Sequence, residues 1–338
     1  EYAATQARMP VEFTLAGFVQ GALDAELRGG ELRENGRVSI EGLAFASPLL
    51  PTGEINDDPI INWGSRTRME APFATRGRVK VESNFGKLEG GGRYDPAEGH
   101  VVRADGALLL DPLLALLPEG MMPPPETMTL GGAVTARLRA AATSPSSYDV
   151  SAVVASGENF ALGAMGDTLA VRSFNAGTSV TLALEPGGNM RADVTAISAT
   201  LEDIAALKGS GVYTREGVVH SFDVHPSVQL DAEKFAAFVQ PFLAARELGE
   251  LAMAGSVSQE FSLKGSLETG EALVFRAPLE IVSTTSSEGI QSLFSNAATE
   301  ASATAEGLSL NVAITAPSPD RVHVSVAPAS MNGFLLGT

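Results

Sequence analysis

Residues 88–138 read LEGGGRYDPAEGHVVRADGALLLDPLLALLPEGMMPPPETMTLGGAVTARL, and a second version follows at residues 207–263, LKGSGVYTREGVVHSFDVHPSVQLDAEKFAAFVQPFLAARELGELAMAGSVSQEFSL. Four landmarks recur in the same order, 118 to 123 positions apart: Tyr94 and Tyr213, Gly99 and Gly217, Asp111 and Asp231, Gly132 and Gly255. The pattern predicts that a structural unit of about 120 residues has been duplicated.

Each version has the same order of local signals. A Gly-rich strand ends in Tyr, a turn closes on Gly, further strand-like runs follow, and Leu-Asp opens an apolar helical patch before Gly and renewed alternation. We therefore expect an N-terminal β meander over residues 1–84, a first repeat over 85–203, and a second repeat over 204–338 that is truncated at its C-terminus.

Alternation of apolar and polar residues outside the repeats indicates further strands. We expect strands at 11–15, 22–27 and 37–43, with Gly29-Gly30 and Asn35-Gly36 as the turns between them. The alternation is lost over residues 47–75, which predicts a long irregular insertion. Its Trp63, the chain's only tryptophan, fits a plug over the edge of the core better than a ligand contact.

The remaining strands complete the fold prediction. They are expected at 131–142, 149–155, 168–174, 178–185, 189–197, 273–282, 308–315 and 322–326. Residues 283–303 are rich in Ser, Thr, Ala and Glu, with a helical turn expected at 290–294. Strands spaced in this way predict a mainly β protein, built on a long antiparallel sheet with one polar and one apolar face and short amphipathic helices.

Two helices are expected, each opened by an aspartate. Asp111 is placed as the N-cap of a helix over 111–117, and the three prolines at 123–125 end that region in an extended spacer. Asp231 caps the second helix, and Pro241 is expected to kink it or end its first half. Helical spacing aligns one apolar stripe on this helix: Phe235, Phe238, Val239 and Phe242. Packing on the sheet fits this stripe better than binding to a membrane surface does.

The composition excludes several classes of function. A net charge of -17, from 40 acidic and 23 basic residues, argues against a nucleic-acid partner. The absence of cysteine excludes disulfides, thiolate metal sites and cysteine nucleophiles. No run of 18 apolar residues exists, so we expect any membrane anchor to lie outside this sequence.

No pattern typical of catalysis or metal binding is visible. The four histidines form no HExxH or His-x-His motif, and the spacing of His220 and His225 places them on opposite faces of a strand. Residues 90–92, Gly-Gly-Gly, lack the Lys-Ser/Thr of a phosphate-binding loop. We therefore expect no enzyme, no metal and no cofactor.

The chain resembles the AsmA-like envelope family, which includes the TamB- and YdbH-type proteins. The resemblance lies in Leu-Asp-Pro-Leu-Leu-Ala-Leu-Leu-Pro at 110–118, followed by Leu-Gly-Gly-Ala-Val-Thr-Ala-Arg-Leu-Arg at 130–139, in their second version, and in Gly-rich alternating strands along nearly the whole chain. The insertion at 47–75 and the missing N-terminal membrane helix depart from the family pattern.

The resemblance implies a long, curled sheet in the periplasm of a diderm bacterium, anchored to the inner membrane through a segment not included here. Its concave apolar face would carry phospholipid acyl chains between the inner and outer membranes. The residues expected to line this groove share one face of their strands: Val79, Val81, Val134, Ala136, Leu138, Val257, Phe261 and Leu263.

One alternative remains open at this stage. The same alternation is also typical of a closed β-sandwich, in which these residues would form a packed core. In that case the chain would be a structural or assembly scaffold of the cell envelope that binds a protein complex.

Overall fold

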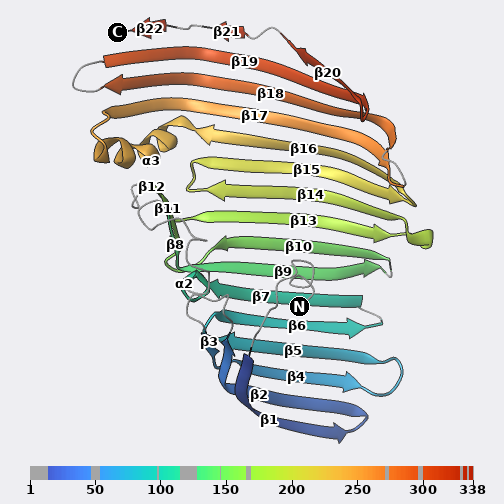
Figure 1. Cartoon of the computed structure of the whole chain (residues 1–338). Coiled ribbons are helices and arrows are strands. Elements are labelled where there is room, and N and C mark those ends of the chain that lie inside the picture. Colours follow the sequence, from blue (N-terminus) through green and yellow to red (C-terminus); the bar gives the residue numbers. More distant parts are fainter. Residues whose placement is uncertain are drawn as a thin grey trace. The chain divides into compact units, whose positions relative to one another are not determined.

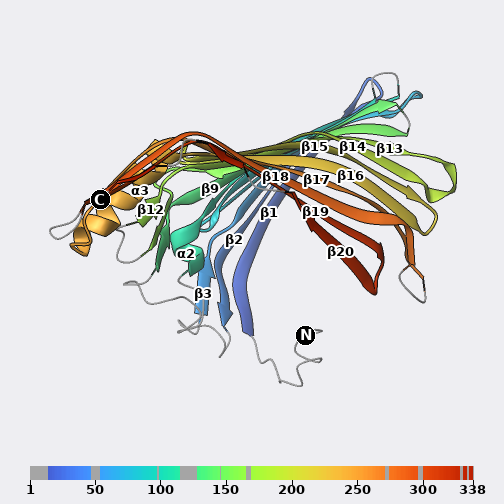
Figure 2. The same cartoon turned by 90° about the horizontal axis from the view of Figure 1, so that it is seen from above.

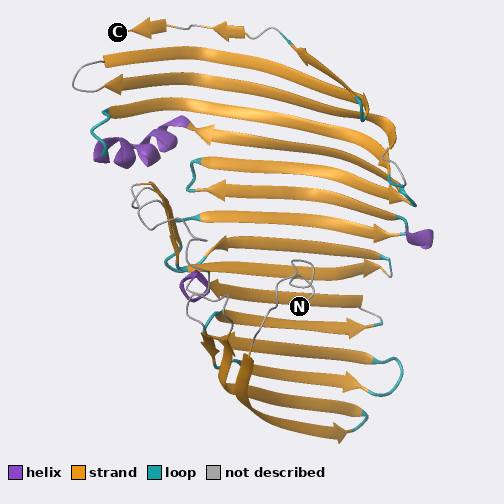
Figure 3. Cartoon of the chain, viewed as in Figure 1, coloured by secondary structure: helices purple, strands orange, loops and turns teal. Residues whose placement is uncertain are grey.

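The structure, a computed structural model, describes residues 14–46, 54–96, 99–114, 128–144, 146–164, 169–270, 274–295, 300–327, 330–332 and 335–337. It divides into two compact units: unit 1 comprises residues 1–141 and 154–167, and unit 2 comprises residues 142–153 and 168–338. The expected boundaries at residues 84 and 203 follow the sequence repeat instead of contacts, and they stay a prediction. Strands account for most of the described residues and helices are few (Figures 1 and 3), which confirms the mainly β, antiparallel prediction.

Unit 1 is an antiparallel meander in which strands adjacent in the sequence pair with each other. A short strand, β3 (Glu54–Asp57), pairs with one end of β2, and in a separate small sheet β8 (Met128–Gly131) pairs antiparallel with β11 (Ala161–Ala164). The helix α2 (Leu110–Leu114) follows β7. The main strands are β1 (Thr14–Arg28), β2 (Glu31–Ala46), β4 (Ile60–Arg68), β5 (Ala74–Ser83), β6 (Gly86–Asp95), β7 (Gly99–Leu109) and β9 (Ala133–Ser144).

Unit 2 continues in the same manner. Its longer strands are β10 (Ser147–Ser156), β13 (Phe174–Leu184), β14 (Met190–Leu201), β15 (Ala205–Glu216), β16 (Val219–Asp231), β17 (Glu250–Glu268), β18 (Val274–Ser295) and β19 (Glu300–Ser318). Its shorter elements are β12 (Leu169–Val171), β20 (Arg321–Val326), β21 (Ser330–Asn332), β22 (Leu335–Gly337), the 3-10 turn η1 (Pro186–Gly188) and the helix α3 (Ala232–Ala245). From β13 to β19 each strand pairs antiparallel with the next.

The N-terminal region corrects two predictions. Two long strands, β1 and β2, replace the three expected ones, and only Gly29-Gly30 forms a turn. Asn35 and Gly36 lie inside β2, because Gly36 is needed beneath Trp63: a Cβ on Gly36 would stand 1.9 Å from the Trp63 ring. The expected insertion at 47–75 is also wrong where it is described, since β3 and β4 fill much of it and Trp63 pairs within the sheet.

The helix α3 bears out its predicted start. The Asp231 carboxylate accepts a hydrogen bond from the backbone N–H of Lys234 at 3.0 Å, as an N-cap does. The helix does not end at Pro241 but continues through it to Ala245. The carbonyl that Pro241 leaves without a partner belongs to Ala237, which is exposed, so water can satisfy it.

Two further expectations differ from the structure. Asp111 lies inside the short α2 instead of capping it, and its carboxylate accepts a hydrogen bond from the Gly132 N–H at 3.2 Å. The helix predicted to reach residue 117 is described only as far as Leu114, and the proline spacer lies outside the described residues. The expected helical turn at 290–294 is wrong, because β18 runs through it, with Ser292 opposite Met253.

The aligned landmarks occupy similar local structures in the two units. All four landmark glycines have positive φ: Gly99 81°, Gly217 60°, Gly132 80° and Gly255 92°. Each Leu-Asp pair lies where a strand passes into a helix, at β7–α2 and at β16–α3. The duplication itself stays a prediction.

The described chain buries few side chains. The buried apolar residues are Ala133, Phe160, Ile204, Ala232, Ala236 and Ala316, and no large side chain is fully buried among the described residues. The described residues therefore do not form the packed interior that a closed sandwich requires.

Candidate functional site

Strand register places the apolar side chains of unit 1 on one face of its sheet. Directly opposite residues of antiparallel strands point to the same face of the sheet. The pairing therefore shows which residues of successive strands share a face. One such row runs across the strands as Val38, Ile61, Val81, Leu88, Gly106 and Ala136. The next row on the same face is Gly36, Trp63, Val79, Gly90, Ala104 and Leu138. We call this the apolar face of unit 1.

The structure brings together the groove residues predicted in unit 1. Val79, Val81, Ala136 and Leu138 belong to these two rows, and Val134 lies opposite Leu108 two positions further along β9. Val79 is 36% exposed and Leu138 is 42% exposed. These side chains therefore share a solvent-accessible surface.

Unit 2 also has one apolar face. Its clearest row crosses eight strands: Val180, Val194, Gly211, Val224, Leu263, Ile281, Ile314 and Val324. The predicted residues Val257 and Phe261 lie on β17 at even spacing from Leu263, so they point to the same side. All three are half-buried.

The residues next to this row along each strand point to the opposite face of unit 2, which is polar. The row beside the apolar one reads Thr181, Asp193, Val212, Asp223, Lys264, Glu280, Thr315 and His323. Hydrogen bonds on this side join Ser221 to Ser266 and Ser258 to Ser286, both at 2.8 Å. The two faces thus differ sharply in chemistry although they share the same strands.

Prediction from sequence missed the most exposed part of the apolar face of unit 1. On β1, Val19, Leu23 and Leu27 are 64%, 65% and 68% exposed, and they face the same side as Leu32 and Ile40 of the paired strand. Their spacing of four residues, with Gly21 and Ala25 between them, weakens the alternation signal. Other missed residues on this face are Leu88, Val102 and Leu108.

The predicted amphipathic helix packs on the sheet of its own unit. α3 lies against β17 and, to a smaller extent, β12 and β16, and Figure 2 shows it to one side of the strands at their ends. The Gln240 side chain fixes it there, since its Oε1 accepts from the Leu251 N–H at 2.9 Å. Phe235, Phe238, Val239 and Phe242 are all half-buried. Arg246 stacks on the Phe242 ring, 4.7 Å from its centroid.

The ionisable groups form ion pairs on the surface. A hydrogen bond from Arg191, with its charge, lowers the pKa of the Asp193 carboxyl. His220 accepts or donates a 2.6 Å hydrogen bond to the Tyr213 hydroxyl on the apolar side, whereas His225 pairs with Asp223 on the polar side, so the two histidines lie on opposite faces as predicted. No group of three or more metal-ligating side chains occurs among the residues that the structure describes.

Comparison with known proteins yields no relative. No family model, curated protein or solved structure matches the chain. Within the described parts of the chain, no helix has the length and hydropathy needed to cross a bilayer.

Proposed function

We propose that the apolar faces of the two units bind phospholipid acyl chains, and that the chain is a periplasmic segment of an AsmA-like protein that conducts phospholipid between the inner and outer membranes. In this proposal the sheet curls into a groove, repeats of about 120 residues lengthen it, and an anchor outside this sequence holds it to the inner membrane. No catalytic step is needed, because acyl chains slide along a continuous apolar surface.

The observation that supports the proposal is an apolar surface left uncovered. Among the described residues the strands mainly contact their paired neighbours, and the helices contact only a few strands: α2 contacts β8, and α3 contacts mainly β17. A soluble protein seldom leaves contiguous apolar patches beyond a few hundred Å² without a binding partner. Each methylene that an acyl chain transfers from water to such a face contributes roughly 0.8 kcal/mol.

The experiment uses neighbouring residues that point to opposite faces. Because the sequence has no cysteine, single-cysteine variants accept a polarity-sensitive fluorophore at one position only. Leu138→Cys and Phe261→Cys report on the apolar faces, and Arg137→Cys and Glu260→Cys are their matched controls on the polar faces. The ligand is a short-chain phosphatidylcholine below its critical micelle concentration.

We expect a saturable blue shift at Leu138→Cys and Phe261→Cys and none at the two controls. Phospholipid should also be extracted from the purified protein, and Leu138→Asp should reduce the amount recovered while the strand signal in circular dichroism is kept. Equal shifts at all four positions, or no shift at any, would contradict the proposal. The assembly scaffold that binds a protein complex would then be the better account.

A further inference from the structure

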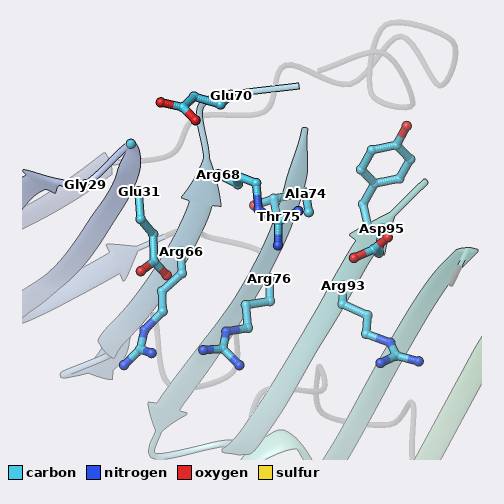
Figure 4. A pocket seen from close by; sticks show the side chains of 12 residues that line it. Gly29, Glu31, Arg66, Arg68, Glu70, Ala74, Thr75, Arg76, Arg93 and Asp95 are labelled. Atoms are coloured by element: carbon cyan, nitrogen blue, oxygen red, sulfur yellow. The ribbon is translucent and has the colours of Figure 1, made fainter. Parts of the chain in front are cut away.

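The polar face of unit 1 is rich in arginine, although the whole chain carries a net charge of -17. One cross-strand row consists of Arg33, Arg66, Arg76 and Arg93. The row beside it runs Asn35, Gly64, Arg78, Gly91, Arg103 and Arg139. Figure 4 shows Arg66, Arg76 and Arg93 extending side by side from neighbouring strands.

This arrangement opposes folding. Like charges directly opposite each other on paired strands are destabilising. Arg66 stands opposite Arg76, and Arg103 stands opposite Arg139. Arg33 forms an ion pair with Glu31, but in the pairings from β2 to β9 no acidic residue stands directly opposite an arginine of these two rows. A bound anion would remove the repulsion.

Two cavities on this face differ in charge. The first, about 610 Å³, lies at the strand ends; its four arginines are Arg66, Arg68, Arg76 and Arg93, and they are balanced by Glu31, Glu70 and Asp95. A hydrogen bond from Arg33 lowers the pKa of the Glu31 carboxyl, and the charges of Arg66 and Arg76 act in the same direction. This cavity is largely compensated by its own acids.

The second cavity, about 960 Å³, retains an excess of positive charge. Its charged side chains are Arg78, Glu89, Arg93, Arg103, Asp105, Arg137 and Arg139. Arg137 already holds Asp105 through a 2.6 Å ion pair. Arg78, Arg103 and Arg139 form no ion pair with any residue that the structure describes. We call these three the arginine cluster.

The cluster surrounds a floor without side chains. Gly91 lies directly between Arg78 and Arg103 in the row, and Gly90 and Gly92 flank it along β6. Adjacent strands are about 4.8 Å apart, so the two arginines leave the strands roughly 10 Å from each other. Guanidinium groups bind phosphate in a bidentate manner, and two of them can converge on an anion placed over Gly91.

We propose that the arginine cluster binds a ligand with several phosphate groups. No aromatic side chain lines the cavity, so the stacking that holds single-stranded nucleic acid is missing. The site lies on the face opposite to Leu138 and therefore does not depend on acyl-chain binding. The phosphates can belong to a soluble polyphosphate or to anionic lipid head groups, and the experiment separates these sources.

The test is calorimetric titration of the full chain with sodium tripolyphosphate at low ionic strength. The triple variant Arg78→Gln, Arg103→Gln, Arg139→Gln should bind at least about tenfold more weakly, since each charge-assisted contact is lost. The control removes the same number of charges from unit 2, through Lys208→Gln, Lys234→Gln and Arg321→Gln, and should bind like the unmodified chain. The Arg→Lys version of the triple variant, which keeps charge but not the bidentate fork, should fall between them.

Flotation with phosphatidylglycerol vesicles shows whether the bound phosphate groups belong to lipid head groups or to a soluble ligand. Flotation that the triple Gln variant abolishes assigns lipid head groups, and tripolyphosphate binding without flotation assigns a soluble ligand; both support the site. Tripolyphosphate binding that the triple Gln variant leaves unchanged, or no binding of either probe, would overturn it. A poly-glutamate peptide that binds as tightly as tripolyphosphate would overturn the preference for phosphate.

Discussion

The ring of Trp63 lies over the bare backbone of Gly36, its direct partner on the neighbouring strand. Since a Cβ at position 36 would stand 1.9 Å from the ring, Gly36→Ala must displace the indole. We expect the free energy of unfolding to fall by about 1–3 kcal/mol, as in other overpacked sites. In a Trp63→Ala background the same substitution should cost much less. A urea-denaturation double-mutant cycle measures the difference, and equal costs in the two backgrounds would show that the ring contact is not the cause.

Two of the landmark glycines, Gly132 and Gly255, should be sensitive to substitution because of both their backbone conformation and their close neighbours. At Gly132 the φ is 80° and a Cβ would stand 2.1 Å from the Asn159 carbonyl oxygen, and at Gly255 the φ is 92° with the Glu288 carbonyl oxygen at 2.5 Å. Gly187 has a similar φ of 84° but open space around it. Gly187→Ala should therefore cost about 1 kcal/mol, and Gly132→Ala and Gly255→Ala clearly more. The thermal midpoints of the three variants check this order.

The Asp193–Arg191 pair gives a pH-dependent prediction. The folded-state pKa of Asp193 is depressed by Arg191, so the pair stabilises the fold above the unfolded-state pKa, near 3.8, and this contribution is lost as the pH falls through the lower folded-state value. Asp193→Asn should reduce the free energy of unfolding at pH 7 by less than about 1 kcal/mol, because the pair is solvent-screened. The difference between variant and unmodified chain should shrink as the carboxyl becomes protonated. A difference that is constant from pH 7 to acid would exclude the charge as its source.

Removing one arginine from the row should stabilise the protein. Arg76 stands between Arg66 and Arg93, so Arg76→Gln relieves repulsion, and we expect the free energy of unfolding to rise by about 0.2–1 kcal/mol at low salt. The gain should diminish in high salt, which screens exposed charges. Arg137→Gln is the matched control, since it breaks the ion pair with Asp105 and should bring no gain. A loss of stability in Arg76→Gln would mean that the row contributes to the fold.

The sequence was sufficient to predict which residues share a face, because a period of two needs only local information. Val79 and Val81 on β5 lie on the same face of the sheet as Val134, Ala136 and Leu138 on β9 for that reason. Turn positions were harder to predict. Asn35-Gly36 has the local signature of a hairpin, but its partner Trp63, on another strand, requires the glycine inside β2. Whether another part of the chain packs on an apolar face also depends on long-range contacts. Alternation of apolar and polar residues does not predict such contacts.

The arginine cluster could not be predicted from local sequence information either. Arg78, Arg103 and Arg139 are scattered over some sixty residues of sequence, so net charge and local charge runs gave no sign of them. Only the register of β5, β6, β7 and β9 aligns them in one row. The negative net charge of the whole chain therefore gave no indication of a basic area on one face of unit 1.

In unit 2, from β13 to β19, each strand is hydrogen-bonded to its neighbours in sequence, and this has a consequence for cooperativity. Since the described residues of unit 2 bury few side chains, the loss of a terminal hairpin removes one interface and leaves the other ladders intact, as in linear arrays described by nearest-neighbour coupling. Hydrogen exchange should then fray inward from the outer strands instead of reporting one global opening. Such a molecule can also lengthen or shorten during evolution by whole hairpins while each remaining strand keeps its partners.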